Sequence, residues 1–341
     1  MAPCAKMDHL PLAWAPVGDV VCRTAFEAVG TWMRRDGKRF RDSRCLLRQA
    51  RCKRAIAATS RNTHGAVDWE SFRLEQWDQM RHNLDGDWRG PIEKLTFPAG
   101  EGGMVHVSEH GQAHYIVRFA ADGKTGLWEG KRLLEQGRPS EYRIPLSRAN
   151  FNPAKGIFNF KGISGQYGVT PTGEFVIETN FLGSDHTRRM IILRWRASDE
   201  PGRPPLQAVT WCGFRNFDAT DWVPVVNRQS PPVEELIDWL AQNPEPTIIQ
   251  ALAASSGTLQ PVSLSHPEVM TAAQLAEMTV TMINDGLFIA VCGTSSEANW
   301  HFVLGRCHPR RDSLHLLHVA VAGRRPTRLS STLFGQVGSI R

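Results

Sequence analysis

The sequence contains no long hydrophobic run. No stretch approaches the ~18 apolar residues that a membrane-spanning helix requires, and no charged start leads into an apolar core of the secretory kind. We therefore expect neither a membrane span nor secretion. At 341 residues, 41% of them hydrophobic, the chain can form about two domains with real cores.

Cysteine is scarce where the chain is expected to fold. Four of the seven cysteines precede residue 67, and the other three are Cys212, Cys292 and Cys307. An odd, sparse set argues against a disulfide framework and is typical of a reducing compartment.

Metal-binding and catalytic signatures are also missing. Two histidine-containing sets lack the carboxylates or the Cys-x-x-Cys pair that would complete a zinc site; they are His106, His110 and His114, and Cys292, His301, Cys307 and His308. Neither Gly-x-Ser-x-Gly nor His-Glu-x-x-His occurs, and the glycines repeated over 162–168 are not followed by the Lys-Ser/Thr of a phosphate loop. We predict no metal and no cofactor.

Positive charge is unevenly distributed. The chain carries a net charge of +6, but residues 1–66 hold 13 basic and 5 acidic residues, which leaves 27 basic and 29 acidic residues in 67–341. A nucleic-acid-binding domain carries its positive charge on the folded surface, so we expect no nucleic-acid partner.

The basic segment 1–66 has two interpretations. Ten Lys/Arg fall within 34–54, and a small-residue stretch, 55–60, follows. This composition fits an organelle transit peptide, which predicts a plastid location, or else a disordered basic arm of a cytoplasmic protein. N-terminal sequencing of the mature protein distinguishes them, because an intact start at residue 1 or 2 contradicts cleavage.

The next segment, 67–220, reads as one helix followed by strands. Asp68 can cap a helix whose apolar residues recur at three- to five-residue spacing up to Leu84, and Gly86 can end it. From Trp88 to Phe217 the period changes to two, with turn signals every 8–15 residues. Many short strands without intervening long helices predict a mainly β fold, a sandwich or an up-and-down antiparallel barrel.

Residues 221–262 are predicted to be a linker that contains a helix, with apolar residues at 233, 236, 237 and 240. Strand-like sequence returns in 263–341, which predicts a second β-rich module too short for a full barrel of its own. This module is a candidate surface for a protein partner.

Several motifs resemble one family. Gly86-Asp87-Trp88 before the first strand, Phe175–Thr179, Arg188-Arg189 and Phe214-Arg215 resemble a lipocalin-like (calycin-type) domain family of unknown function from cyanobacteria and plastid-bearing eukaryotes. The resemblance covers residues 68–218 and, more faintly, 275–338. It implies a lipocalin-like barrel and often a plastid location, and it implies no established reaction.

The barrel resemblance also implies a floor. In such barrels a Trp of the first strand closes the floor and an Arg of the last strand lies across its ring, which here implies Trp88 and Arg215. We interpret the pair as structural, because cation–π pairs are common in ordinary cores.

Candidate ligand contacts follow from strand alternation. Glu178 shares a strand face with Val176 and Asn180, and hairpin pairing brings it near Arg188 or Arg189. A buried carboxylate must be paired or protonated, so Glu178 is either a structural ion pair or the polar contact of a ligand. Seven of the eleven Trp fall between 69 and 222, and we expect Trp128, Trp195 and Trp211 among them to line a cavity.

Three functions remain open from the sequence. The first is binding of a small hydrophobic molecule, such as a pigment, tetrapyrrole or isoprenoid, inside the barrel. The second is an enzyme on the same fold, of chromophore-attachment or cyclase/isomerase type, which rests on fold analogy alone. The third is a structural or assembly factor that acts through 263–341.

Overall fold

The computed structural model describes residues 68–97, 107–134, 139–183, 186–197, 204–218, 230–255, 258–262, 269–284, 286–292, 299–308 and 313–335. The basic segment 1–66 and its predicted targeting role lie outside the described residues, as does His106. No helix among the described residues combines the length and apolar character needed to cross a membrane.

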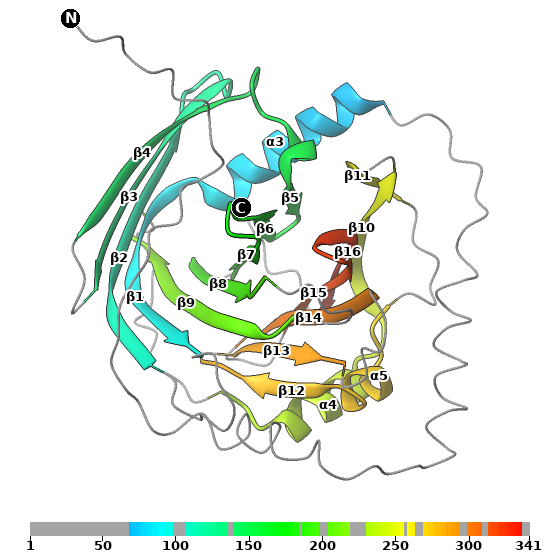
Figure 1. Ribbon diagram of the computed structural model, residues 1–341. Coiled ribbons are helices and arrows are strands. Elements are labelled where there is room, and N and C mark those ends of the chain that lie inside the picture. The colour runs from blue at the N-terminus through cyan, green and yellow to red at the C-terminus, as the bar shows by residue number, and fades with distance from the viewer. Residues whose placement is uncertain are drawn as a thin grey trace, which may run out of the picture.

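The first part of the chain is a helix followed by a curled antiparallel sheet (Figure 1). Helix α3 spans Trp69–Leu84, and a short 3-10 helix, η1, spans Pro153–Lys155. The strands are β1 (Gly86–Thr96), β2 (Val107–Phe119), β3 (Thr125–Leu134), β4 (Ser140–Ser147), β5 (Ile157–Phe160), β6 (Ile163–Val169), β7 (Phe175–Leu182), β8 (Thr187–Trp195) and β9 (Leu206–Asn216). The prediction of a mainly β fold preceded by a short helix is confirmed.

The first sheet is a half-barrel. Its strand order is β4-β3-β2-β1-β9-β8-β7-β6-β5, an up-and-down meander in which the first strand pairs with the last. Closure would require β4 to pair with β5, and within the described residues these two strands are the free edges. The closed barrel that the sequence predicted is therefore replaced by an open, curled sheet.

Helix α3 explains why the sheet stays open. The side-chain amide of Gln76 accepts a hydrogen bond from the backbone N–H of Asn159 (2.7 Å) and donates one to the Asn159 carbonyl (2.8 Å). Gln76 thus satisfies the edge of β5 as a neighbouring strand would. Across the gap, Pro145 in β4 has no N–H, which suits an edge strand.

The Gly-Asp-Trp motif joins the helix to the first strand. Gly86 has φ +145°, and a Cβ there would lie 2.8 Å from Nε1 of Trp88. The missing side chain lets the indole fold back, and Nε1 donates to the Leu84 carbonyl at 2.8 Å. Asp68 caps the other end of α3 as predicted, because its carboxylate accepts from the N–H groups of Glu70 and Ser71.

A second sheet follows. Helices α4 (Val233–Gln242) and α5 (Ala272–Ala276) accompany β10 (Pro246–Ser255), β11 (Thr258–Pro261), β12 (Thr279–Met282), β13 (Leu287–Val291), β14 (Asn299–Cys307), β15 (Ser313–Ala322) and β16 (Arg325–Gly335). The order is β11-β10-β16-β15-β14-β13-β12, so again the first strand pairs with the last and a break separates two consecutive strands. Both sheets follow one topological plan.

Strands β10 and β11 correct the predicted linker. The sequence predicts a linker over 221–262, yet β10 pairs with β16 and belongs to the second sheet. Its sequence, PTIIQALAAS, alternates weakly and is rich in alanine, so periodicity alone does not reveal a strand.

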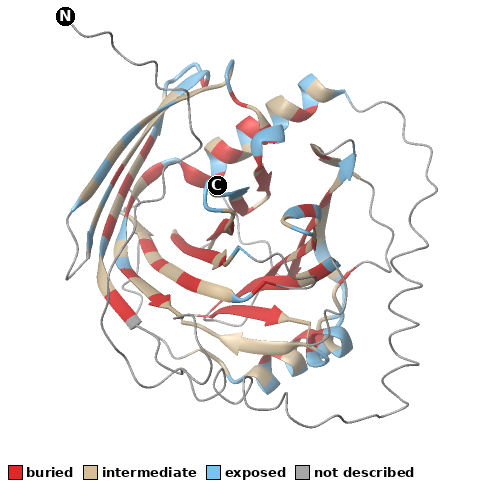
Figure 2. Ribbon diagram, in the orientation of Figure 1, coloured by how far each residue is buried: buried red, intermediate tan, exposed pale blue. Residues whose placement is uncertain are grey.

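The two sheets share one hydrophobic core. One cluster joins Phe175 and Trp195 of the first sheet to Trp300 and Phe302 of the second. Trp195 lies 5.1 Å from Trp300 and 5.0 Å from Phe302, ring centroid to ring centroid. Figure 2 shows this buried belt running through β7, β8, β14 and β15. Trp195 is therefore part of the packing between the sheets and does not face the inside of the curl.

Two buried histidines of β15 make stability depend on pH. Burial, with a further contribution from Arg306, lowers the pKa of His315 to about 3, and burial with His301 and Arg328 does the same for His318. Both are neutral when folded, whereas in the unfolded chain they bind protons below their ordinary pKa near 6.5. Their stabilising contribution is complete above pH 6.5 and is lost as the pH falls towards 3.

We expect the free energy of unfolding to fall by about 1.4 kcal/mol per pH unit for each of these histidines across that window. Urea titrations at a series of pH values measure the slope. His315→Phe keeps a ring beside Phe181. It should remove about half of the part of the slope that the two histidines cause. A variant slope equal to that of the wild type would contradict the assignment.

Candidate ligand-binding site

The concave face of the first sheet carries the polar cluster. Along β7 and β8, odd-numbered residues such as Ile191 enter the core between the sheets, and even-numbered residues such as Met190 and Ile192 face the inside of the curl. Glu178 and Arg188 therefore share the concave face, whereas Arg189 lies on the convex face. The side chains of these two adjacent arginines therefore lie on opposite faces of the sheet.

Arg188 is the most unusual side chain in this cluster. It is only 1% exposed, and its guanidinium lies 4.7 Å from the Trp88 ring, 4.8 Å from the Phe214 ring and 5.9 Å from the Tyr115 ring. Nε, Nη1 and Nη2 have no hydrogen-bond partner among the described residues. Burial lowers the pKa of Arg188 to about 10, so it still carries its charge at neutral pH.

This geometry corrects the predicted barrel floor. Arg188, not Arg215, is the cation over Trp88. Arg215 is in register with Arg89 on β1 and points to the convex face. The sequence predicted an arginine of the last strand over this ring, but strand alternation places Arg215 on the convex face and its neighbour Phe214 on the concave face with Trp88.

Three aromatic residues form a wall beside Arg188. The ring centroids of Tyr115, Trp128 and Tyr142 lie 6.0–6.3 Å apart. Gly130 leaves room for this wall, because a Cβ there would lie 2.0 Å from Tyr142. Burial raises the pKa of Tyr142 to about 12 and that of Tyr115 well above its usual value, so both phenols stay protonated.

Arg132 adds a second cation to the concave face. Its Nε donates a hydrogen bond to the Tyr115 hydroxyl, and its guanidinium lies 5.4 Å from the Tyr115 ring and 5.9 Å from the Tyr142 ring. The sequence analysis did not identify Arg132, Tyr115 or Tyr142. The available signal was alternation, which places Arg132 on the same face as Trp128, but the pairing of β2 with β3 was needed to bring Tyr115 to them.

Glu178 partly balances these charges. It is 5% exposed and accepts hydrogen bonds from Asn180 Nδ2 (3.1 Å) and Gln166 Nε2 (3.3 Å). These amide contacts take the place of the predicted ion pair with Arg188, whose nitrogens stay without hydrogen bonds. With two arginines and one glutamate, the cluster has an excess of one positive charge.

Exposure on the concave face increases toward β4. Most concave-face residues of β7, β8 and β9 are buried, whereas Trp128, Arg132 and Tyr142 on β3 and β4 are partly exposed. Figure 2 shows the same gradient, from tan strands at β3 and β4 to red strands at β7 and β8.

The remaining predicted residues lie elsewhere. Arg189, Trp211 and Arg215 line a groove on the convex face rather than the inside of the curl. Each occupies an outward position in the strand alternation, so none of the three faces the inside of the curl.

A serine–histidine–glutamate chain also lies on the convex face. Ser108 Oγ is 3.0 Å from Nε2 of His110, and Nδ1 of His110 is 3.8 Å from a carboxylate oxygen of Glu93. The atoms follow the order of a catalytic triad, but Ser108 is 0% exposed and its hydroxyl also donates to Glu93 (3.3 Å). The chain fixes the orientation of His110. The described residues contain no group of three or more metal ligands.

Comparisons with known proteins give distant fold neighbours. No family model and no curated protein matches the chain. Among solved structures, a protein of unknown function of the DUF3598 family from Nostoc punctiforme is 12% identical and has a TM-score of 0.48, covering 77% of this chain and 99% of its own. A protein named EF1p2_mFAP2b, bound to DFHBI, is 11% identical, with a TM-score of 0.24 and coverage of 41% and 99%. An AttH-like protein from Nitrosomonas europaea is 9% identical, with a TM-score of 0.19 and coverage of 75% and 94%.

Proposed function

We propose that the protein binds a small, largely apolar molecule with one anionic group inside the curled first sheet. The observation that carries the proposal is the guanidinium of Arg188, which is buried, charged and without hydrogen bonds among the described residues. A buried charge is unfavourable by several kcal/mol unless a partner compensates it. A carboxylate is the matching partner, because it can accept two parallel N–H bonds from a guanidinium.

The walls of the site indicate the rest of the ligand. Trp88, Tyr115, Trp128, Tyr142 and Phe214 present flat rings around the two arginines. Such rings suit a planar or polyene body, as in a pigment, a tetrapyrrole or an isoprenoid acid. The proposed fold relationship agrees with this function, since the half-barrel keeps the meander of a lipocalin-like barrel with β1 paired to β9.

A matched pair of probes tests the proposal. Retinoic acid and retinol share one polyene body and differ in the carboxylate. Titrations followed by quenching of tryptophan fluorescence should show saturable binding of both, with the acid bound about tenfold tighter or more, the range for a charge-assisted hydrogen bond. Equal affinities would contradict recognition of the acid, and absence of saturable quenching would reject binding inside the sheet.

Glu178→Gln removes a negative charge from the site. The charge of Glu178 acts on Arg188, where it raises the pKa. Removing it should strengthen retinoic acid binding by about two- to tenfold, because a charge at this range is worth on the order of 1 kcal/mol at an effective dielectric of ~20. Retinol affinity should not change. Weaker binding of the acid would instead identify Glu178 as a direct ligand contact.

A further inference from the structure

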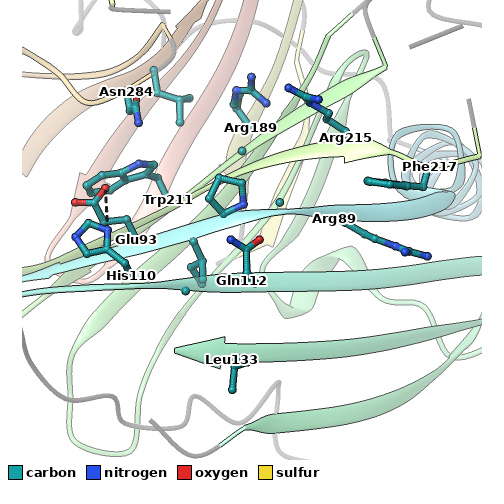
Figure 3. Close-up of a pocket in the computed structure, with 16 residues that line it drawn as sticks. Arg89, Glu93, His110, Gln112, Leu133, Arg189, Trp211, Arg215, Phe217 and Asn284 are labelled. Carbon is teal, nitrogen blue, oxygen red and sulfur yellow. Dashed lines mark ion pairs between the residues drawn. The ribbon is translucent and has the colours of Figure 1, made fainter. Parts of the chain in front are cut away.

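A second concave feature lies on the opposite face of the first sheet. A groove of about 680 Å³ runs over β1, β2 and β9 up to the turn before β13, where Asn284 and Leu287 close one side (Figure 3). This volume falls within the range of small-molecule sites. The sheet separates the groove from Arg188, so the two sites are independent.

Three glycines line the hollow. Gly90, Gly111 and Gly213 lie along its floor, and Pro91 interrupts the pairing of β1 with β9 between Arg89 and Ile92. A Cβ at Gly90 would lie 1.9 Å from the Gly213 carbonyl oxygen, so the two strands approach each other only because this residue is glycine.

Three arginines from adjacent strands enter the groove. Arg89 on β1 is directly opposite Arg215 on β9, and Arg189 on β8 is opposite Gly213, two residues from Arg215. Directly opposed like charges destabilise a sheet. Asp87 offsets Arg89 through contacts of 2.6 and 2.9 Å. Glu93 is the single carboxylate among the described lining residues, and it faces His110.

Arg189 is held toward the groove. It is 3% exposed, and Nη1 donates to the Phe214 carbonyl at 3.3 Å. Its guanidinium lies against Gly213, whose Cβ position is 3.5 Å from Nη1. A buried, positioned guanidinium beside a second arginine is the arrangement that binds doubly charged oxyanions.

The groove also collects apolar surface. Leu133 is 52% exposed and Phe217 is 49% exposed, and these are two of the three large hydrophobic residues that are exposed in the described part of the chain. Trp211 adds its indole. Figure 3 shows Trp211 with the Glu93–His110 pair toward one end and Phe217 with Arg89 toward the other.

We propose that this groove is a second binding site, which takes a small organic dianion, a phosphate ester with an aromatic or short apolar body. The phosphate contacts Arg189 and Arg215, and the body packs against Phe217, which lies two residues beyond Arg215 on the same face. A phosphate ester has several charged oxygens that can accept hydrogen bonds from both guanidinium groups at once, and its double charge favours a site with two arginines over a neutral molecule.

The test uses 1-naphthyl phosphate, with 1-naphthol and inorganic phosphate as the two half-ligands, in isothermal titration calorimetry of the full chain. The ester should bind saturably and at least about tenfold tighter than either half-ligand, with an affinity that falls as salt is added. Arg215→Met should weaken the ester by about tenfold or more. Phe217→Ala, at an exposed position, should weaken the ester and leave inorganic phosphate unchanged.

Arg143→Met is the matched control, because Arg143 is 71% exposed on β4 and pairs with Glu129 away from the groove. It removes the same charge and should leave the ester affinity unchanged. Thermal unfolding followed by circular dichroism confirms that each variant folds. Loss of affinity in Arg143→Met equal to that in Arg215→Met, or no saturable binding of the ester by the wild type, would overturn the proposal.

Discussion

Replacement of Trp88 by alanine is expected to lower the free energy of unfolding by about 3–5 kcal/mol, the usual range for a buried aromatic residue. Trp88 is 3% exposed, and its indole packs on Gly86, covers the Arg188 guanidinium and donates to the Leu84 carbonyl. The substitution therefore removes the contact between α3 and β1 and uncovers a buried charge. Urea unfolding followed by circular dichroism measures the effect.

Trp88→Phe separates the parts of this effect. Phenylalanine keeps a ring over Arg188 but loses the bond to Leu84, so about 1 kcal/mol of destabilisation is expected for the hydrogen bond, together with some loss of packing. If Trp88→Ala leaves the urea midpoint unchanged, Trp88 does not join helix to sheet, and the proposed role of the Gly-Asp-Trp motif is wrong.

Replacement of Arg188 by methionine is expected to move stability and binding in opposite directions. Methionine fills a similar volume without a charge, so the free energy of unfolding should rise by about 1–3 kcal/mol. The rise is smaller than the largest rises seen when buried ionic groups are replaced, because the two close contacts of the guanidinium with aromatic rings are lost. Retinoic acid affinity should fall by at least about tenfold to the level of retinol, which is unaffected. Higher stability together with weaker binding is expected when a residue destabilises the fold but contributes to ligand binding.

Arg189→Met is the control on the same strand. Its side chain lies on the convex face, where it donates to the Phe214 carbonyl. The substitution should leave the difference between retinoic acid and retinol intact. If Arg188→Met binds retinoic acid as the wild type does, or if Arg189→Met abolishes the preference for the acid, the site is not on the concave face.

The sequence alone determined the local elements. Asp68 and the apolar stripe identified α3, and period-two alternation identified β7, β8, β9 and the strands of the second sheet from residue 279 onward. Alternation also required Arg188 and Arg189 to occupy opposite faces. These properties follow from contacts between residues close in the chain, which a single sequence displays directly.

Only the tertiary structure decided which face is concave and what each side chain meets there. The cation over Trp88 is Arg188 rather than Arg215, Trp195 packs against Trp300, and Arg132 reaches Tyr115, because strand register joins residues that are far apart in sequence. A shift of one residue in register would exchange the faces. The sequence pattern likewise did not show that the first sheet is open. At the edge of β5, Gln76 of the helix takes the place of a neighbouring strand. Hydrophobic periodicity does not show which partner satisfies a backbone group.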